Sequence, residues 1–224
     1  TIWPETRTKR FREPARVHEE IAWLQETYGA EYLFFADDIF TLDRRWLYRM
    51  LEEMRSLQRP IAWGCATRVD AVDAGVLQAM AQAGCVGIQF GVESGNQHLL
   101  DSVKHIEKER VLAAVRESLA VGIEPVCSFM VPFPEDTEET VRETGRFMKQ
   151  VADLGARVVL SYTTPYPGTY FHDHADELGI RLLTEKWDEF DAKHNVIETR
   201  YLNDAQINQL VDETVREIGM QRSV

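Results

Sequence analysis

The chain alternates short apolar runs with longer stretches in which apolar residues recur every three or four positions. The apolar runs predict five β-strands, at Tyr32–Ala36, Ile61–Thr67, Gly87–Val92, Pro125–Val131 and Arg157–Thr163. These runs lack a clean alternation of apolar and polar residues. Such runs are typical of strands that are buried on both faces of a parallel sheet.

Helical patterns separate the runs. Pro14 is suited to the first turn of a helix, and Trp46–Leu57 predicts a second one. Further helices are expected around Val76–Ala83 and Val111–Leu119. Another is expected to start at Asp136, as N-cap of a capping box with Glu139. Five helical stretches end in a glycine, which predicts left-handed caps at Gly29, Gly84, Gly122, Gly155 and Gly179.

Alternating helices and strands predict an α/β fold with a parallel sheet. No linker rich in Gly, Ser or Pro divides the repeats, but the pattern weakens after Gly179 and one further helix is expected over Ala205–Gly219. We therefore predict a barrel over residues 1–180 and a C-terminal helical extension over residues 181–224.

Charge and cysteine content narrow the function classes. The formal net charge is -12, and a nucleic-acid partner is not expected because such binding rests on Lys and Arg at phosphates. No stretch approaches the ~18 apolar residues of a membrane-spanning helix, so no membrane partner and a cytoplasmic location are expected. Cys65 and Cys127 lie inside predicted strands and Cys85 at the base of another, which favours buried apolar thiols over metal ligands.

Polar residues follow each predicted strand. Because the carboxyl ends of parallel strands meet at one rim, the loops after them predict a small-molecule site there. Asp38, Asp70 and Asn96 could instead cap the helices that follow them. Glu93 directly follows the apolar run Ile88–Val92, and a carboxylate there needs a hydrogen-bonding partner or a ligand.

At these loops the sequence resembles the radical S-adenosylmethionine (radical SAM) superfamily, over about residues 10–180. The matching stretches are Phe35–Thr41, Ala66–Asp70, Gly91–Gly95, Phe129–Glu135 and Thr164–Gly168. The similarity is greatest to the branch that often carries an upstream cobalamin-binding domain. The resemblance implies a partial (β/α)6 TIM-like barrel of parallel strands, with its first strand missing from this chain.

The resemblance also implies an activity. Family members cleave S-adenosylmethionine reductively with a [4Fe-4S] cluster, and the 5′-deoxyadenosyl radical then abstracts hydrogen from a substrate. A small-molecule or peptide substrate is expected, with an electron donor such as flavodoxin or ferredoxin. Cobalamin is a candidate cofactor, since the resemblance includes cobalamin-dependent methyltransferases. The resemblance leaves methyl transfer, oxidation and rearrangement of the substrate open.

The family's Cys-x-x-x-Cys-x-x-Cys loop is absent from this sequence. Three thiolates must converge to hold such a cluster, so its ligands are expected outside this chain and this fragment alone is expected to be inactive. One alternative is a cluster-free barrel that only binds S-adenosylmethionine or a protein partner. Another is a conventional barrel aldolase or isomerase, which a Lys on a strand would favour, but the predicted strands contain none.

The resemblance assigns cofactor-binding positions. Asp37 and Asp38 match the loop that holds the methionine amino group, for which a carboxylate or carbonyl is a suitable acceptor. Glu93 matches the ribose-binding position, and Ser128 is expected to face the ribose from the next strand.

Two further assignments concern the other ends of the cofactor. Arg68 or Lys104 is expected to pair with the methionine carboxylate, Arg through a planar fork and Lys as a point charge. The adenine wall is assigned to two stretches, which contain Met130, Val131, Tyr162 and Thr164. The sequence identifies no catalytic residue and no metal ligand.

Overall fold

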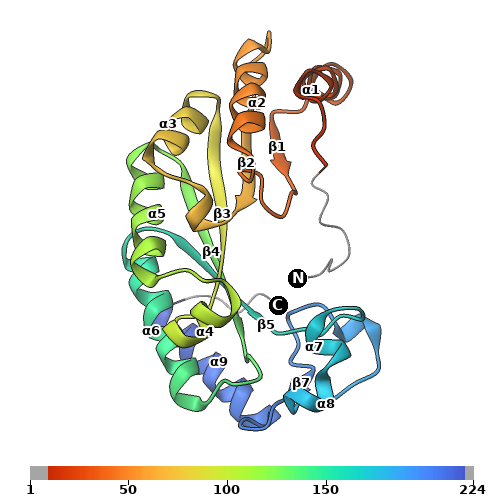
Figure 1. Cartoon of the computed structure of the whole chain (residues 1–224), viewed down its shortest axis with the longest axis vertical. Helices are drawn as coiled ribbons and strands as arrows, with labels where there is room; N and C mark the ends of the chain where they lie inside the picture. Colours follow the sequence, from red (N-terminus) through yellow and green to blue (C-terminus); the bar gives the residue numbers. More distant parts are fainter. Residues whose placement is uncertain (1–9, 220–224) are drawn as a thin grey trace.

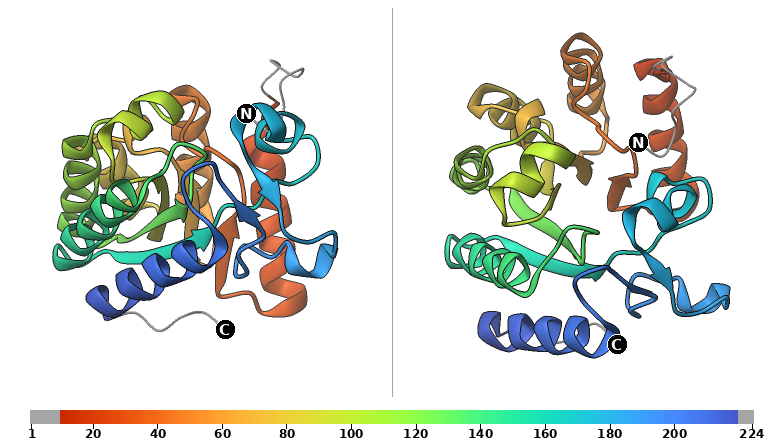
Figure 2. Two further views of the ribbon diagram at one scale, coloured as in Figure 1. Left: turned by 90° about the horizontal axis from the view of Figure 1, so that it is seen from below. Right: turned by 60° about the horizontal axis from the view of Figure 1, so that its bottom comes forward.

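The computed structural model describes residues 10–219, and a parallel sheet dominates them. Its strand order is β1-β2-β3-β4-β5, and every neighbouring pair is parallel. The strands are β1 (Tyr32–Phe35), β2 (Ala62–Thr67), β3 (Cys85–Glu93), β4 (Glu124–Val131) and β5 (Arg157–Tyr162). The sheet curves, with helices arrayed around its outer side (Figure 2). The prediction of a partial parallel barrel is therefore confirmed.

The outer face of the sheet is covered by helices. They are α1 (Pro14–Tyr28), α2 (Arg44–Ser56), α3 (Ala74–Gln82), α5 (Lys108–Ala120) and α6 (Glu138–Asp153), with the short η1 (Val69–Ala71) and α4 (Gln97–Val103) in the loops after β2 and β3. Trp63, Phe90 and Met80 are fully buried between strands and helices. These side chains belong to one hydrophobic core that joins the sheet to the helices.

The alternation of side chains along each strand separates an outer from an inner face. On β4, Cys127 and Phe129 are buried in the core under the helices, whereas Ser128 and Met130 are only partly buried. Successive side chains of a strand point to opposite faces. Ser128 therefore lies on the inner, concave face, where Gly91 of β3 is its neighbour in register.

Two helix starts differ from the sequence prediction. Asp43, rather than Asp38, caps α2 by accepting from the Trp46 N–H. The N-cap of α6 is Thr137, which forms the capping box with Thr140. Asp136 is the residue before this N-cap. Its carboxylate instead accepts from the Phe133 N–H in the loop after β4 and from the Thr140 hydroxyl.

The remaining described residues pack against the barrel. They form α7 (Tyr170–Asp173), α8 (Ala175–Leu178), the antiparallel pair β6 (Arg181–Leu182) and β7 (Ile197–Glu198), η2 (Trp187–Glu189) and α9 (Asp204–Ile218). The predicted last helix is confirmed as α9, which lies beside α6 (Figure 1). Its residues Ile207 and Leu210 pack on Val131 and Tyr162. The small sheet was not predicted, and the boundary at residue 180 stays a prediction.

None of the described helices is both long and apolar enough to cross a membrane.

Candidate functional site

A partly buried ion pair lies at the carboxyl end of β3. The Glu93 Oε1 atom is 3.0 Å from Lys104 Nζ, and the two side chains are only 18% and 24% exposed. Glu93 is the last residue of the strand, at a register shift that begins at Gly91, and its φ is 79°. A bulge re-aims a side chain, and left-handed backbone is strained for a residue other than glycine. The backbone therefore holds this carboxylate in a position that an ordinary strand end would not give it.

Arg68, the first residue after β2, supports the ion pair from the neighbouring loop. Its guanidinium donates to both oxygens of Asp70, at 2.8 and 2.7 Å, and Nη2 also donates to the Lys104 carbonyl at 2.7 Å. The hydrogen bonds to Arg68 lower the pKa of Asp70, and those to Asp70 raise the pKa of Arg68. The Arg68 guanidinium is thus already engaged by Asp70 and by the Lys104 carbonyl. Its hydrogen bond to that carbonyl positions Lys104. Of the two candidates for the methionine carboxylate, Lys104 is the one beside Glu93.

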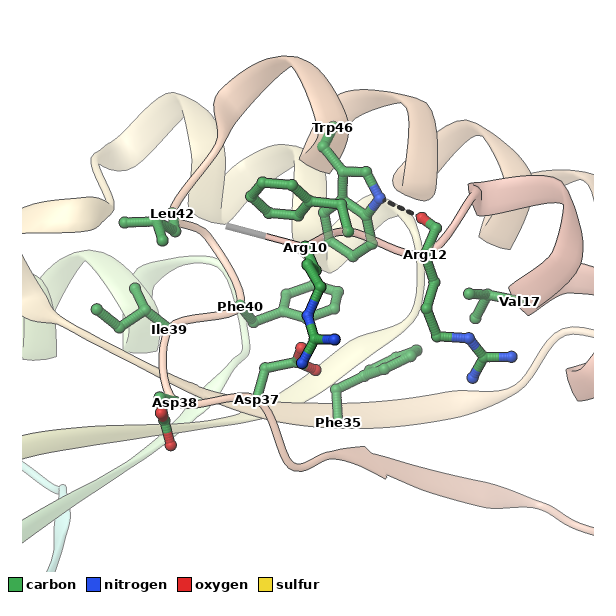
Figure 3. A pocket seen from close by; sticks show the side chains of 11 residues that line it. Arg10, Arg12, Val17, Phe35, Asp37, Asp38, Ile39, Phe40, Leu42 and Trp46 are labelled. Carbon is green, nitrogen blue, oxygen red and sulfur yellow. Dashed lines mark hydrogen bonds between the residues drawn. The ribbon is translucent and has the colours of Figure 1, made fainter. Parts of the chain in front are cut away.

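Asp37 and Asp38 lie at the end of β1, apart from the ion pair. They line a cavity of about 270 Å³ together with Phe35, Phe40 and Trp46. Figure 3 shows the Arg10 side chain reaching toward Asp37, whereas Asp38 points away from it. Neighbouring strands are about 4.8 Å apart, so β1 and β3 are separated by roughly 10 Å. The same rim of the sheet therefore carries two separate groups of charged side chains.

Ser128 and Met130 lie on the inner face of the sheet together with Glu93. Ser128 Oγ donates to the Phe90 carbonyl at 3.4 Å, and Gly91 is its neighbour in register. Met130 is two positions further along the same strand face.

Val131 and Tyr162 do not join this inner-face group through their side chains. Both pack in the cluster under α9, and the Tyr162 hydroxyl donates to Asn208 Oδ1 at 2.8 Å. The strand alternation turns these two side chains outward, so an adenine wall could use only their backbone. Thr164 Oγ1 donates to the Tyr162 carbonyl at 3.2 Å, just beyond the end of β5.

The sequence reasoning missed a buried carboxylate near this rim. Asp136 is 1% exposed and accepts from the Phe133 N–H at 2.7 Å and the Thr140 hydroxyl at 2.6 Å. Burial raises its pKa from 3.8 to about 6. Its place after Pro-Glu suggested a helix cap, and nothing in the local sequence indicates that the loop is buried.

The cysteines do not form a cluster site. Cys65, Cys85 and Cys127 are free and buried, and burial raises the pKa of Cys127 to about 12. The pKa of Cys65 is raised well above its usual value by its hydrogen bond with Cys85 and by burial. Over residues 10–219, no three His, Cys, Asp or Glu side chains are grouped to hold a metal ion. The residues of this chain thus do not fit a [4Fe-4S] cluster, because three thiolates must converge on the irons and these three thiols are buried and lie apart from any such group among the described residues.

Comparisons with known proteins agree with this architecture. An uncharacterized methyltransferase of Pyrococcus horikoshii is 29% identical over 197 residues, which cover 88% of this chain and 42% of that protein. The anaerobic magnesium-protoporphyrin IX monomethyl ester cyclase of Cereibacter sphaeroides is 32% identical over 152 residues, covering 64% of this chain and 24% of the cyclase. The chain thus spans less than half the length of these relatives.

A solved structure shows the same fold. The radical S-adenosylmethionine methyltransferase TsrM from Kitasatospora setae, solved with cobalamin and a [4Fe-4S] cluster bound, superimposes with a TM-score of 0.69 at 20% sequence identity. The alignment covers 91% of this chain and 48% of TsrM. The model of the radical SAM superfamily matches residues 2–148. With more than half of its length in that match, the chain belongs to the radical SAM superfamily.

Proposed function

We propose that this chain supplies the S-adenosylmethionine-binding barrel of a radical SAM enzyme that acts on a small molecule or a peptide. The observation that carries the proposal is the Glu93 carboxylate, fixed by a bulge and a left-handed backbone at the carboxyl-end rim of a parallel sheet. Strain that surrounding structure maintains is a reason to look for function at a residue. Ligands of parallel α/β sheets also bind at this rim.

The inner face offers suitable partners for a nucleoside. A carboxylate at Glu93 can accept hydrogen bonds from both ribose hydroxyls, and the Ser128 hydroxyl lies beside it on the next strand. The Lys104 ammonium, 3.0 Å from Glu93, can pair with the methionine carboxylate. Asp37 and Asp38 lie two strands away, where they can accept from the methionine ammonium.

Reductive cleavage of S-adenosylmethionine is the chemistry that the family's [4Fe-4S] cluster supplies when bound. The cysteines of this chain do not fit that cluster, and its ligands belong to residues outside it under this proposal. A reductive reaction also needs an electron donor, for which flavodoxin or ferredoxin are the candidates. Methyl transfer with cobalamin is the finer version of the proposal, supported by the similarity to an uncharacterized methyltransferase and to TsrM.

The test is binding of S-adenosylmethionine to the chain, measured by calorimetry or ligand-observed NMR. The Glu93→Gln variant should bind about tenfold more weakly, since it loses a charge-assisted acceptor. Glu124→Gln is the matched control, because Glu124 is exposed at the opposite, amino end of β4. Equal affinity of the Glu93→Gln variant and the unaltered chain would reject the assignment.

A cluster-free barrel that only binds S-adenosylmethionine is the second candidate, favoured by the burial of all three cysteines. Anaerobic reconstitution of the protein with its neighbouring segments separates the two proposals. A bound cluster with visible absorption supports the enzyme, and a colourless protein that still binds S-adenosylmethionine supports the alternative.

A further inference from the structure

A second cavity opens on the same rim as Glu93. It measures about 500 Å³ and lies between the end of α4, the loop after β4 and the helix α7. In Figure 1 the loop after β4 runs between α4 and α7. Val103, Phe133, Pro134, Phe171 and Leu178 give it an apolar wall. Small-molecule sites are typically concave and apolar, with a few polar groups that set the orientation of the ligand.

One wall of this cavity is preformed. Phe133 is only 2% exposed, and its N–H donates to the buried Asp136 carboxylate at 2.7 Å. Its ring meets the Phe171 ring edge-to-face, with centroids 6.1 Å apart and planes at 83°. Pro134 beside it is also buried. A ligand therefore meets a surface whose side chains need no ordering when it binds.

The open side of the cavity carries an aromatic ring and a carboxylate. Tyr170 is 55% exposed although it lines an apolar cavity, and its ring lies 4.4 Å from the His174 ring. Glu135 is the one charged side chain among the described residues that line the cavity. An ammonium or guanidinium is attracted both to a carboxylate and to the face of an aromatic ring. The net charge of -12 also favours a cation over an anion.

Two segments that line the cavity continue in the chain into the proposed nucleoside site. Val103 directly precedes Lys104, whose ammonium is paired with Glu93. Phe133 follows the end of β4, the strand that carries Ser128 and Met130 on the inner face. The cavity and the proposed nucleoside site thus share the segments that follow β3 and β4.

We propose that this cavity binds the substrate of the enzyme through an apolar group that carries a positively charged nitrogen. That the bound molecule is the substrate rests on the proposed function. The binding itself does not, since it needs no S-adenosylmethionine. An amine of a small molecule and a Lys or Arg side chain of a peptide share this chemistry.

The test is an NMR shift titration of the chain with phenethylammonium as probe and phenethyl alcohol as its neutral counterpart. The ammonium should bind at least fivefold more tightly than the alcohol, with shifts at the cavity residues. Glu135→Gln should abolish that preference, and Tyr170→Ala should weaken ammonium binding several-fold.

Matched controls lie outside the cavity. Glu139→Gln removes the same charge from the exposed start of α6, and Tyr201→Ala removes an equally exposed ring, so both should bind phenethylammonium like the unaltered chain. Equal binding of alcohol and ammonium, or an unchanged preference in the Glu135→Gln variant, would overturn the proposal. So would shifts confined to other parts of the chain.

Two further probes distinguish the sources of the cation. A blocked Phe-Lys dipeptide that binds more tightly than phenethylammonium indicates a peptide substrate, and the reverse order indicates a small amine. If the Glu93→Gln variant binds S-adenosylmethionine as tightly as the unaltered chain, the cation-binding results are unaffected, because they are measured without S-adenosylmethionine. Conversely, an empty cavity would not affect the binding of S-adenosylmethionine at Glu93.

Discussion

The carboxylate of Glu93 occupies the space that a side chain on Gly91 would need. A Cβ atom built on Gly91 would lie 2.7 Å from Glu93 Oε1 and 3.4 Å from Lys104 Nζ. The first distance is far below van der Waals contact. A side chain at residue 91 would therefore push the Glu93 carboxylate out of its observed position, although Gly91 touches no ligand in the proposed function.

Gly91→Ala should displace the Glu93 carboxylate and weaken S-adenosylmethionine binding about tenfold, while costing only about 1–2 kcal/mol of stability from overpacking. Binding is measured by calorimetry and stability by denaturant unfolding. Gly87→Ala is the matched control on the same strand face, because its new Cβ would have no neighbour closer than 4.0 Å. If Gly91→Ala binds as tightly as Gly87→Ala, the ion pair is not part of the site.

Asp136 predicts a pH dependence of stability. Its pKa is raised by burial from 3.8 to about 6, so the folded chain retains a proton that the unfolded chain releases between these values. This contribution to stability is fully present below pH ~4 and is lost as the pH rises through about 6. For so buried a group, the difference between the two pKa values corresponds to about 3 kcal/mol as an upper bound.

Asp136→Asn should remove the fall in stability as the pH rises through about 6, because the amide does not titrate there. The amide can still accept from the Phe133 N–H and donate to the Thr140 hydroxyl. Unfolding free energies of both proteins are compared from about pH 4.5 to 7.5, with the exposed Asp153→Asn as control. The Asn variant should become the more stable protein as the pH rises. A constant difference across this range would contradict the raised pKa.

The sequence predicted the strands well because each is an apolar run bounded by glycine or polar residues. All five glycines expected as helix ends have positive φ, between 66° and 104°. These features are local, since the strand run and the left-handed cap depend on residues close in the chain. The parallel order follows from the alternation of helices and strands.

The details of the site were less predictable because they depend on distant residues. Val131 and Tyr162 lie in strands without a clean polar alternation, so the sequence could not tell which side chains face α9. The burial of Asp136 depends on the surrounding loops, and the bulge at Glu93 depends on pairing with β4. Glu93 itself could be selected, since a carboxylate after an apolar run needs a partner.

Arg68→Lys should weaken the hydrogen bonds that hold Asp70 and the Lys104 backbone next to the Glu93–Lys104 ion pair. A Lys cannot donate to both Asp70 oxygens and to the Lys104 carbonyl at once, as the planar guanidinium does. The pKa of Asp70, now lowered by Arg68, should rise, which carbon-detected NMR titration measures directly. Arg146→Lys is the control at an exposed ion pair on α6. An unchanged Asp70 pKa would show that this contact does not persist in solution.

The chain by itself should bind no iron–sulfur cluster and should not cleave S-adenosylmethionine. Its three cysteines are buried and free, and a thiol with a pKa of about 12, as for Cys127, is almost entirely protonated at neutral pH. Anaerobic incubation with iron and sulfide should therefore leave the protein colourless. An aromatic disulfide reagent should label the thiols slowly in the folded chain and rapidly after unfolding, a control showing that burial protects them. A stoichiometric cluster, or 5′-deoxyadenosine produced by the reconstituted chain, would show that these cysteines can converge and would refute the expectation that the ligands lie elsewhere.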